Sequence, residues 1–325
     1  MPYRAAFALL WEDPAHGYPP PVPFPVPFLP PGYRSRPSTT DDVPAIHTLV
    51  TACEREVYGR GQSDAGAIAA DLARPGLVPD ADTVLVLDPA GRLAARAWVD
   101  RRSEVDVHPE HRGRGLGAAL LGWTLARARQ AGAVRIVQTV PDADTRAVTL
   151  LRAHGYEPLV TAWLLEFAMP AEPAVPEPPE GITVRPFHTG DGPATHVLVQ
   201  DAFDEWQERR QSYEEWAAHT VERPTFAPQR SALAFAGDHL VGAALALDVP
   251  GTNEGYLEQV AVRRDHRGRG VARLLLRHTF RAFHRTGRCS CTLWTHSDTG
   301  ALDLYLRVGM TVRHSSTVFR KDLGA

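Results

Sequence analysis

The pentapeptide His-Arg-Gly-Arg-Gly occurs twice in this chain of 325 residues. It stands at His111 to Gly115 and at His266 to Gly270, each time after a short apolar run and before an aliphatic stretch. The match extends over Val105–Leu121 and Val260–Leu276 at a constant spacing of 155 residues, counted from 111 to 266. A repeat of this length indicates two whole domains rather than a solenoid of short units.

Further matches on both sides support the duplication. Arg36-Pro37 and His47 correspond to Arg185-Pro186 and His196, and Asp144-Thr145 with Ala147 corresponds to Asp298-Thr299 with Ala301. A length of 325 residues also suits about two domains at a typical ~150 residues each, and each would be long enough to bury its own core.

Two proline-rich segments divide the chain. Residues 171–181, AEPAVPEPPEG, cannot form a helix or a central strand at this proline density, so we interpret them as a semi-rigid linker. The leader, residues 1–32, fits either a polyproline II arm that recognises a partner or a segment packed along its own domain. We therefore predict an N-terminal domain at 33–170 and a C-terminal domain at 182–325.

The overall composition argues against several classes of protein. A net charge of −3 gives no global reason to expect a nucleic acid or an anionic membrane as partner. The apolar run at 5–11 is short and prolines follow it, so we expect neither a membrane span nor a secretory signal, and a cytoplasmic location. Cys53, Cys289 and Cys291 are predicted to be free thiols, because His296 alone does not complete a metal site.

The order of predicted elements is clearest in the second half. Apolar periodicity and turn signals predict strands at 182–187, 232–236, 240–247, 256–262 and 289–294, and helices at 193–202, 213–221, 270–283 and 299–307. Such an order implies an α/β fold, a mixed sheet with helices on both faces.

The glycine-rich turn predicts an anion site. Gly268 and Gly270 allow the backbone to come close to a ligand, and the following helix begins with N–H groups that lack intrahelical partners. A pyrophosphate would suit these groups. The turn lacks both the Gly-Lys-Ser/Thr of the nucleotide P-loop and the dinucleotide fingerprint. A tight turn without a ligand is the alternative, and the second copy makes it less favoured.

These motifs resemble those of a known family. The segments from Arg112 to Gly117 and from Arg267 to Ala272, R-x-x-G-x-G and R-x-x-G-x-A after Val-x-Val strands, resemble the acetyl-CoA signature of the GCN5-related N-acetyltransferase (GNAT) family. The resemblance covers almost the whole chain after the leader. It implies two tandem GNAT-like domains, each with a mixed, mostly antiparallel sheet whose central parallel strands splay apart.

The resemblance also implies where acetyl-CoA, the co-substrate, would bind, and it implies no metal. In the family the turn holds the coenzyme pyrophosphate, and pantetheine hydrogen-bonds to the splayed strand. The implied coenzyme residues are Val260, Ala261, Val262, Arg267, Gly268, Arg269, Gly270, Val271 and Ala272 in the C-terminal domain, and Val105, Asp106, Val107, Arg112, Gly113, Arg114, Gly115, Leu116 and Gly117 in the N-terminal domain.

Acetyl transfer to an amine requires a base and a proton donor. The incoming ammonium must lose a proton, and the leaving thiolate, with an ordinary thiol pKa near ~8.5, is helped by a donor. The resemblance implies Tyr305, four residues before Gly309, as that donor. For the base we predict Glu258, because it shares strand parity with Val260 and Val262 and should point to their face. Binding the substrate ammonium is the alternative role of this glutamate.

The first copy lacks both catalytic groups. Leu151 and Ser103 stand where the second copy has the tyrosine and the glutamate, whereas the glycine-rich turn is kept. We therefore predict an N-terminal domain that can still hold acetyl-CoA but does not transfer from it, and a catalytic C-terminal domain. Because some family members work without the tyrosine, Glu104, His108 and His111 remain alternatives in the first domain.

The charged residues of the pentapeptide have two interpretations each. A histidine side chain can change its charge near neutral pH, which suits catalysis. His111 and His266 both precede the turn, however, where capping it or facing solvent is favoured over catalysis. Arg114 and Arg269 suit coenzyme phosphates by their charge, and solvent exposure explains them equally well.

The acceptor should be recognised by the least repeated part, the two early helices of the C-terminal domain. Aromatic residues with interspersed acids there suit a cationic amine, although tryptophans at this spacing are more often core. We predict Phe203, Trp206, Tyr213 and Glu254 as substrate-binding residues. The expected partner is a small-molecule amine, and a homodimer is left open.

We thus predict an acetyl-CoA-dependent N-acetyltransferase in which a small primary amine attacks the thioester directly at the C-terminal site. One alternative is mycothiol-synthase-like acetylation of a cysteinyl amine, from which Tyr256 departs at a position where an acid is expected. Self-resistance by acetylation of an antibiotic amine is another. From a different class, a non-catalytic acyl-CoA sensor or an interaction protein remains open.

Overall fold

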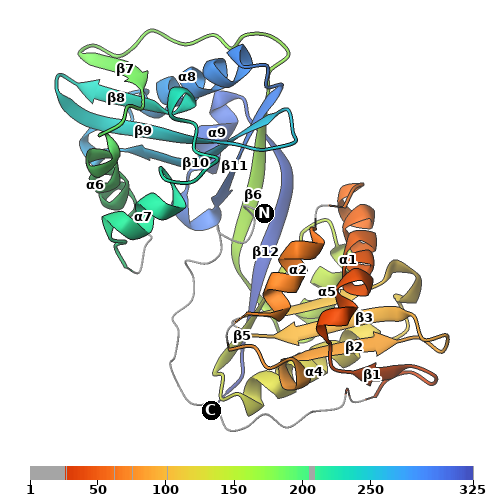
Figure 1. Cartoon of the computed structure of the whole chain (residues 1–325). Helices are drawn as coiled ribbons and strands as arrows, with labels where there is room; N and C mark the ends of the chain where they lie inside the picture. Colours follow the sequence, from red (N-terminus) through yellow and green to blue (C-terminus); the bar gives the residue numbers. More distant parts are fainter. Residues whose placement is uncertain are drawn as a thin grey trace. The chain divides into compact units, whose positions relative to one another are not determined.

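The computed structural model describes residues 26, 28–61, 63–74, 76–100, 102–204 and 209–324, so most of the predicted leader lies outside the described residues. The described chain forms two compact units. Unit 1 contains the residues up to Thr161 and those from Ser315 onward, and unit 2 contains Ala162–His314. Each unit has its own part of a twelve-stranded sheet and its own helices, as Figure 1 shows. Among the described residues, no helix combines the length and the apolar composition that a membrane span requires.

The sheet of unit 1 has the strand order β1-β2-β3-β4-β5-β12. Neighbouring strands are antiparallel, except that β4 and β5 are parallel. The strands are β1 (Arg34–Arg36), β2 (Thr83–Leu87), β3 (Leu93–Val99), β4 (Ser103–Val107), β5 (Arg135–Pro141) and the end of β12 (Thr311–Asp322).

Helices cover both faces of this sheet because its strands alternate apolar side chains between two cores. On β2, Leu85 packs with Ile46 of α1, whereas Val84 and Val86 pack in the cluster that contains Leu120 of α4. The helices of unit 1 are α1 (Val43–Tyr58), α2 (Ala65–Leu72), α3 (Pro79–Asp82), α4 (Leu116–Gln130) and α5 (Thr145–Ala153).

The sheet of unit 2 repeats this plan with the order β6-β11-β10-β9-β8-β7. Here β10 and β11 are the parallel pair. The strands are the end of β6 (Glu157–Ala168), β7 (Ile182–Pro186), β8 (Ala232–Ala236), β9 (His239–Asp248), β10 (Glu254–Val262) and β11 (Ser290–His296).

Two cores also flank the sheet of unit 2. On β10, Val262 packs with Leu274 of α8, and the preceding residue, Ala261, packs with Val199 and Trp216 on the opposite face. The helices of unit 2 are α6 (Gly192–Phe203), α7 (Tyr213–His219), α8 (Val271–Arg285) and α9 (Leu302–Val308). The predicted α/β class, with mixed sheets and helices on both faces, is confirmed.

Two long strands are divided between the units. In β6, residues 162–168 pair with β11 and belong to unit 2. In β12, residues 316–322 pair with β5 and belong to unit 1. The C-terminal strand therefore pairs with the strands of unit 1, whereas the predicted C-terminal domain comprised all of 182–325.

An ion pair near the start of each unit shows the duplication at the level of single atoms. The guanidinium of Arg36 donates two hydrogen bonds to Asp42, at 2.8 and 2.6 Å. Arg185 donates two hydrogen bonds to Asp191 in the same way, at 2.6 and 2.8 Å. In each unit the aspartate precedes the first long helix, so the bidentate pair fixes the entry of the chain into that helix.

Candidate active site

Each glycine-rich turn brings two left-handed glycines to the N-terminus of a helix. Gly113 and Gly115 have φ of 74° and 86°, and Gly268 and Gly270 have φ of 75° and 84°. Directly after them, α4 and α8 begin without a side-chain cap. The first N–H groups of both helices are therefore available to a ligand, and with the helix dipole they suit a pyrophosphate.

The arginine that opens each turn is directed toward the protein. Nε of Arg112 donates to the carbonyl of Val107 at 3.2 Å, and Nε of Arg267 donates to that of Val262 at 3.1 Å. Both carbonyls end the strand before the turn, so each arginine ties the strand to the turn. This geometry favours backbone N–H groups as the pyrophosphate ligands, with the two arginines as their support.

The histidines of the pentapeptide are buried beside the turns. His111 is 7% exposed and His266 is 9% exposed. Nδ1 of His111 lies 2.8 Å from the hydroxyl of Tyr33, and Nδ1 of His266 lies 2.8 Å from a carboxylate oxygen of Asp265. Arg114 also donates to the Tyr33 hydroxyl, at 3.1 Å. These contacts favour the structural interpretation of the histidines over the catalytic one.

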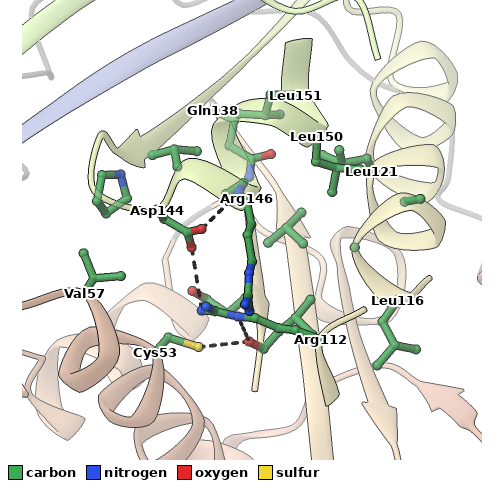
Figure 2. Close-up of a pocket in the computed structure, with 18 of the residues that line it drawn as sticks. Cys53, Val57, Arg112, Leu116, Leu121, Gln138, Asp144, Arg146, Leu150 and Leu151 are labelled. Atoms are coloured by element: carbon green, nitrogen blue, oxygen red, sulfur yellow. Dashed lines mark hydrogen bonds and ion pairs between the residues drawn. The ribbon is translucent and has the colours of Figure 1, made fainter. Parts of the chain in front are cut away.

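A cavity of about 440 Å³ opens in unit 1 between the parallel strands β4 and β5 (Figure 2). Pairing of these two strands is confined to Ser103 and Gln138, after which they diverge. The lining includes Cys53, Val57, Arg112, Gln138, Asp144 and Leu151. The cavity joins the glycine-rich turn to the point where the strands part, which is the path that an extended pantetheine arm requires.

Unit 2 has the same splay and adds an irregularity beside it. The parallel strands β10 and β11 pair as far as Leu257 and Leu293 and part beyond them. On its other edge, β10 shifts register against β9 between Leu257 and Gln259. Glu258 is the extra residue of this β-bulge, so it lies where the two parallel strands separate.

The bulge places Glu258 on the face opposite that of Val260 and Val262. Those two valines pack against the core that contains α8. The carboxylate of Glu258 instead lies 3.7 Å from the guanidinium of Arg223, in the segment that follows α7. The predicted shared face is therefore wrong, because the extra residue breaks the alternation of side chains along the strand.

The carboxyl of Glu258 is largely withdrawn from water. Its side chain is 19% exposed, and burial raises its pKa above the usual range. The positive charges of Arg223 and then His219 act in the other direction and lower this pKa. A buried carboxylate with a raised pKa is a better proton acceptor near neutral pH than an exposed one.

Tyr305 is buried on α9, four residues before Gly309, whose φ of 95° ends the helix. Burial raises the pKa of its phenol to about 12, so the hydroxyl keeps its proton at neutral pH. Tyr256 on β10 is buried as well; burial raises the pKa of its phenol, and the charges of Glu258 and Tyr305 raise it further. The three side chains thus form one electrostatic cluster next to the splay.

Two predicted acceptor residues lie on the α6 and α7 side of the sheet. Phe203 and Tyr213 both pack against the cluster that contains Trp216. Trp216 is fully buried, and its Nε1 donates to the side chain of Gln259 at 3.0 Å. This tryptophan is therefore part of the core.

Of the two other predicted acceptor residues, Glu254 lies among the described residues and is not brought to the bulge. Glu254 begins β10, four residues before Glu258, and its carboxylate accepts a hydrogen bond from Arg313 at 2.9 Å. Trp206 lies outside the described residues. The predicted catalytic residues Glu258 and Tyr305 both act electrostatically on Tyr256.

Comparison with known proteins identifies the family of this fold and site. The model of the Acetyltransferase (GNAT) family matches residues 77–156 and 181–310, one segment in each half of the sequence and together more than half of the chain. The chain belongs to the GNAT acetyltransferase family. The tandem organisation predicted from the repeat is confirmed, and the use of acetyl-CoA by GNAT enzymes agrees with the two glycine-rich turns.

Individual relatives of this acetyltransferase agree with the family assignment. Mycothiol acetyltransferase of Saccharopolyspora erythraea is 31% identical over 258 residues, which cover 71% of this chain and 82% of the relative. Mycothiol acetyltransferase of Nocardioides sp. is 29% identical over 222 residues, which cover 63% of this chain and 75% of the relative.

Solved structures show the same architecture. The GCN5-related N-acetyltransferase from Sphaerobacter thermophilus is 31% identical, with a TM-score of 0.72 over 92% of this chain and 98% of that one. A tandem GNAT protein from the clavulanic acid biosynthesis pathway is 18% identical, with a TM-score of 0.63 over 90% of this chain and 99% of that one, and it shares the fold.

Within this acetyltransferase, unit 1 lacks the counterparts of the acid and the phenol. Leu151 is 1% exposed and lines the cavity with its aliphatic side chain. Ser103 is fully buried, and its hydroxyl donates to the carbonyl of Val137 at 3.1 Å. From Ser103 to Val107, β4 pairs with β3 in continuous register. At the two aligned positions, unit 1 therefore has a serine and a leucine instead of the bulged carboxylate and the phenol, although Glu54 and Tyr58 also line its cavity.

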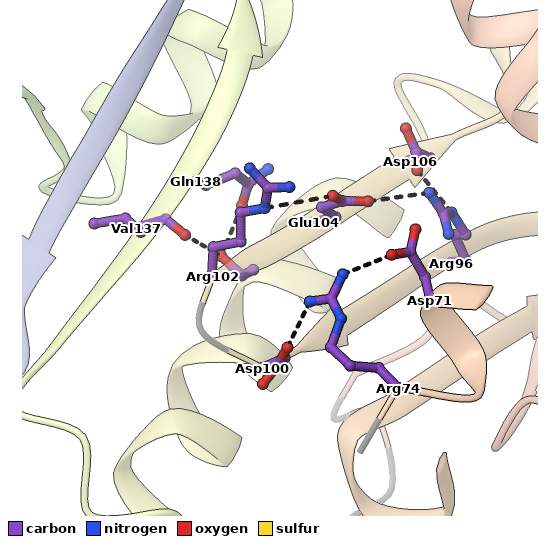
Figure 3. A network of polar contacts seen from close by, with 10 residues as sticks. Asp71, Arg74, Arg96, Asp100, Arg102, Glu104, Asp106, Val137 and Gln138 are labelled. Carbon is purple, nitrogen blue, oxygen red and sulfur yellow. Dashed lines mark hydrogen bonds and ion pairs between the residues drawn. The ribbon is translucent and has the colours of Figure 1, made fainter. Parts of the chain in front are cut away.

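Charged side chains fill the α1 side of β3 and β4 in unit 1 (Figure 3). Arg96 donates to Asp106 at 2.8 Å and to Glu104 at 3.3 Å. Burial raises the pKa of Asp106, and the neighbouring Arg96 lowers it. In unit 2 the residues at the corresponding register are Ala243 and Ala261. At this register, unit 1 thus has a network of ion pairs, whereas unit 2 has two small apolar side chains.

Two cationic residues of these sites, Arg223 and Arg146, were not predicted from the sequence. Arg223 lies in an irregular segment, where periodicity gives no signal. Arg146 is an exposed residue of α5 that lines the cavity of unit 1. The repeat itself could have revealed Arg146, because the aligned position in the second copy is Gly300.

The thiols of the described chain are free. Cys53 lines the cavity, and its Sγ donates to the carbonyl of Val107 at 3.3 Å. Burial raises the pKa of this thiol to about 12, so it stays protonated and unreactive at neutral pH. No group of three or more His, Cys, Asp or Glu side chains that could hold a metal ion occurs among the residues that the structure describes.

Proposed function

We propose that unit 2 transfers the acetyl group of acetyl-CoA to a small-molecule primary amine by direct attack of the amine on the thioester. Unit 1 holds the coenzyme in its cavity and does not transfer from it. The observation that carries the proposal is the contrast between the copies. Unit 2 carries the bulged Glu258 and the buried Tyr305, whereas Ser103 and Leu151 stand at the aligned positions of unit 1.

The roles in the transfer follow from the protonation of the two side chains. Glu258 accepts the proton of the incoming ammonium, directly or through water, because burial makes its carboxylate a stronger base. Tyr305 keeps its proton below a pKa of about 12 and can donate it to the leaving thiolate. Positioned groups of this kind typically contribute roughly 10²- to 10⁴-fold to a rate.

A second observation, besides the missing glutamate and tyrosine, supports the proposal that unit 1 does not transfer the acetyl group. The network of Arg96, Asp106 and Glu104 covers the face of β4 that, in unit 2, faces α6 and α7. An amine that approached from that side would meet paired charges instead of a free surface. Coenzyme in the cavity of unit 1 would therefore lack an open approach for an acceptor as well as a counterpart of Glu258.

A second candidate is acetylation of a cysteinyl amine. It is favoured by the relatives named mycothiol acetyltransferase, which are 31% and 29% identical to this chain. The phenol of Tyr256 stands where an acid would be expected in that enzyme, so this chain would use Glu258, two residues further on, in its place.

Turnover of acetyl-CoA over a panel of primary amines, including cysteinyl amines and aminoglycosides, tests the proposal. Tyr305→Phe should lower kcat by about 10²-fold or more. Tyr156→Phe is the matched control, because Tyr156 lies in the core of unit 1 and burial raises its pKa to about 12 as well. This control should keep wild-type turnover. Binding of acetyl-CoA without acetylation of any amine would favour the sensor and overturn the proposal.

Calorimetry tests the division of labour between the units. Two coenzyme sites per chain would support an idle first unit, and one site, lost on substitution in unit 2, would overturn the holding role of unit 1. An absence of coenzyme binding would overturn both roles.

A further inference from the structure

Arg223 has an unusual environment for a residue next to a buried acid. Its guanidinium lies 3.7 Å from the carboxylate of Glu258, beyond hydrogen-bonding distance. Within the described chain its other side-chain contact is a long hydrogen bond of 3.5 Å to the carbonyl of His219. The side chain is 38% exposed, whereas that of Glu258 is 19% exposed. Most of the five N–H donors of this arginine are therefore available to a ligand at the mouth of the site.

The charge of this pair constrains the acceptor. With Glu258 ionised and Arg223 protonated, the pair is neutral, and His219 adds further positive potential on the same side. A simple alkylammonium bound to Glu258 would place a second positive charge within a few ångströms of Arg223. Like charges at that distance repel, most strongly in a site withdrawn from water.

A zwitterion removes this conflict. An α-amino acid carries its ammonium and its carboxylate on one carbon, at a spacing comparable to the 3.7 Å between the facing atoms of Arg223 and Glu258. Its ammonium would donate to Glu258, and its carboxylate would accept a bidentate pair of hydrogen bonds from Arg223. One loose ion pair would be replaced by two charge-assisted contacts, and the site would stay neutral.

We infer that the acceptor of unit 2 is an amine that bears a free carboxylate beside the amino group, an amino acid or a close analogue, with Arg223 as the residue that selects it. This inference rests on the proposed function and names its substrate class. The amine is placed by Glu258 and the carboxylate by Arg223, so a neutral amide or a decarboxylated amine of the same side chain is a poorer acceptor.

The test uses acceptors with the same side chain and measures the ratio of their kcat/KM values. For each amino acid that the full-length enzyme acetylates, cysteine included, kcat/KM is compared with that of its primary amide and of the decarboxylated amine. The acid should exceed both by about 10-fold or more. The comparison with the amide is conservative, because the amino group of an amide has a lower pKa than that of the acid and is more often unprotonated at neutral pH.

Variants of Arg223 distinguish a role in selecting the substrate from a role as counter-ion of Glu258. Arg223→Gln should reduce the ratio of acid to amide to about 1 to 3, and Arg223→Lys, which keeps the charge without the fork, should give an intermediate ratio. Arg209→Gln is the matched control. Arg209 is an exposed arginine paired with Glu215 at the start of α7, and its variant should keep the wild-type ratio. Thermal unfolding of each variant shows whether the fold is kept.

The outcomes are distinguishable. Acetylation of amides and simple amines as efficiently as acids by the wild type would overturn the inference and leave the proposed function standing. An equal loss for acid and amide in Arg223→Gln would also overturn it, because Arg223 would then serve as a counter-ion of Glu258. Failure to acetylate any amine would overturn the proposed function itself.

Discussion

Arg96 and Asp106 are paired across β3 and β4, and the guanidinium donates a hydrogen bond of 2.8 Å to the carboxylate. The two side chains are 12% and 25% exposed, so both charges are largely removed from water. A charge in such a place depends on its partner, since removal of one partner leaves the other buried and uncompensated.

The first prediction concerns this pair. Arg96→Ala should destabilise unit 1 by about 3 to 5 kcal/mol, because it leaves the carboxylate of Asp106 largely buried without its arginine partner. The double variant Arg96→Ala with Asp106→Ala recreates the apolar pair of Ala243 and Ala261 found in unit 2, and it should be less destabilised than the single variant. Urea unfolding of the full chain measures both free energies.

The exposed pair of Arg209 and Glu215 provides the control for this comparison. Its side chains are 70% and 47% exposed, so Arg209→Ala should cost less than about 1 kcal/mol. Additive destabilisation in the double variant of Arg96 and Asp106 would contradict the interpretation, because it would mean that the two charges do not depend on each other.

The second prediction concerns the glycine-rich turn of unit 2. Gly270 has φ of 84°, and a Cβ built there would meet nothing within 4 Å. Gly270→Ala should therefore act through backbone strain of about 1 to 2 kcal/mol and through loss of close approach by the coenzyme. We expect the Kd of acetyl-CoA at unit 2 to rise by about 10-fold or more, measured by calorimetry.

Gly287→Ala is matched to this variant. Gly287 follows α8 with φ of 81° and also has open space around its Cβ, but it lies at the other end of the helix. It should show a similar loss of stability with unchanged affinity for acetyl-CoA. Equal weakening of affinity in both variants would remove the turn from the coenzyme site.

Much of the fold could be predicted from the sequence, because regular periodicity reports which elements have a buried face. The strand predicted at 232–236 is β8 (Ala232–Ala236), and the helix predicted at 213–221 is α7 (Tyr213–His219). The glycines of both turns were predicted to lie close to a ligand, and their positive φ agrees with this. These features depend on short-range properties of the chain.

Three other features depend on long-range pairing and gave no local signal. The bulge at Glu258 arises from the register of β10 against β9, so strand parity placed its side chain on the wrong face. The end of β12 pairs with β5 of unit 1, and its local sequence gives no signal for this pairing. Arg223 reaches Glu258 from an irregular segment, where no periodic pattern exists.

The third prediction concerns stability in acid. The bidentate Arg36 lowers the pKa of Asp42 to about 2, below its ordinary value in the unfolded chain. The pair should thus contribute to stability above the unfolded pKa near ~4, and the contribution should be lost as pH falls toward about 2. Because Arg36 is half-exposed, we expect about 1 to 2 kcal/mol.

Asp42→Asn should remove this contribution at pH 7 and flatten the acid dependence of the free energy of unfolding between about pH 4 and pH 2. Asp41→Asn, at the exposed neighbouring position, is the control and should leave the acid dependence close to that of the wild type. Equal curves for the wild type and Asp42→Asn would show that the pair contributes no pH-dependent stability.

The last prediction concerns the pH profile of acetyl transfer. Because burial raises the pKa of Glu258, kcat/KM should fall on the acidic side through an inflection above the ordinary range of a glutamate. Glu258→Gln should lower the rate by roughly 10² to 10⁴ and remove this inflection. The positive charge of Arg223 holds the pKa of Glu258 down, so Arg223→Gln should shift the inflection to higher pH.

His219 and the phenol of Tyr256 also face this carboxylate, so the profile must be compared with those of His219→Gln and Tyr256→Phe. His219 has a smaller effect than Arg223 on the pKa of Glu258, and its variant should move the inflection less. An inflection that persists in Glu258→Gln would assign the acidic limb to another group and remove the glutamate from the role of base.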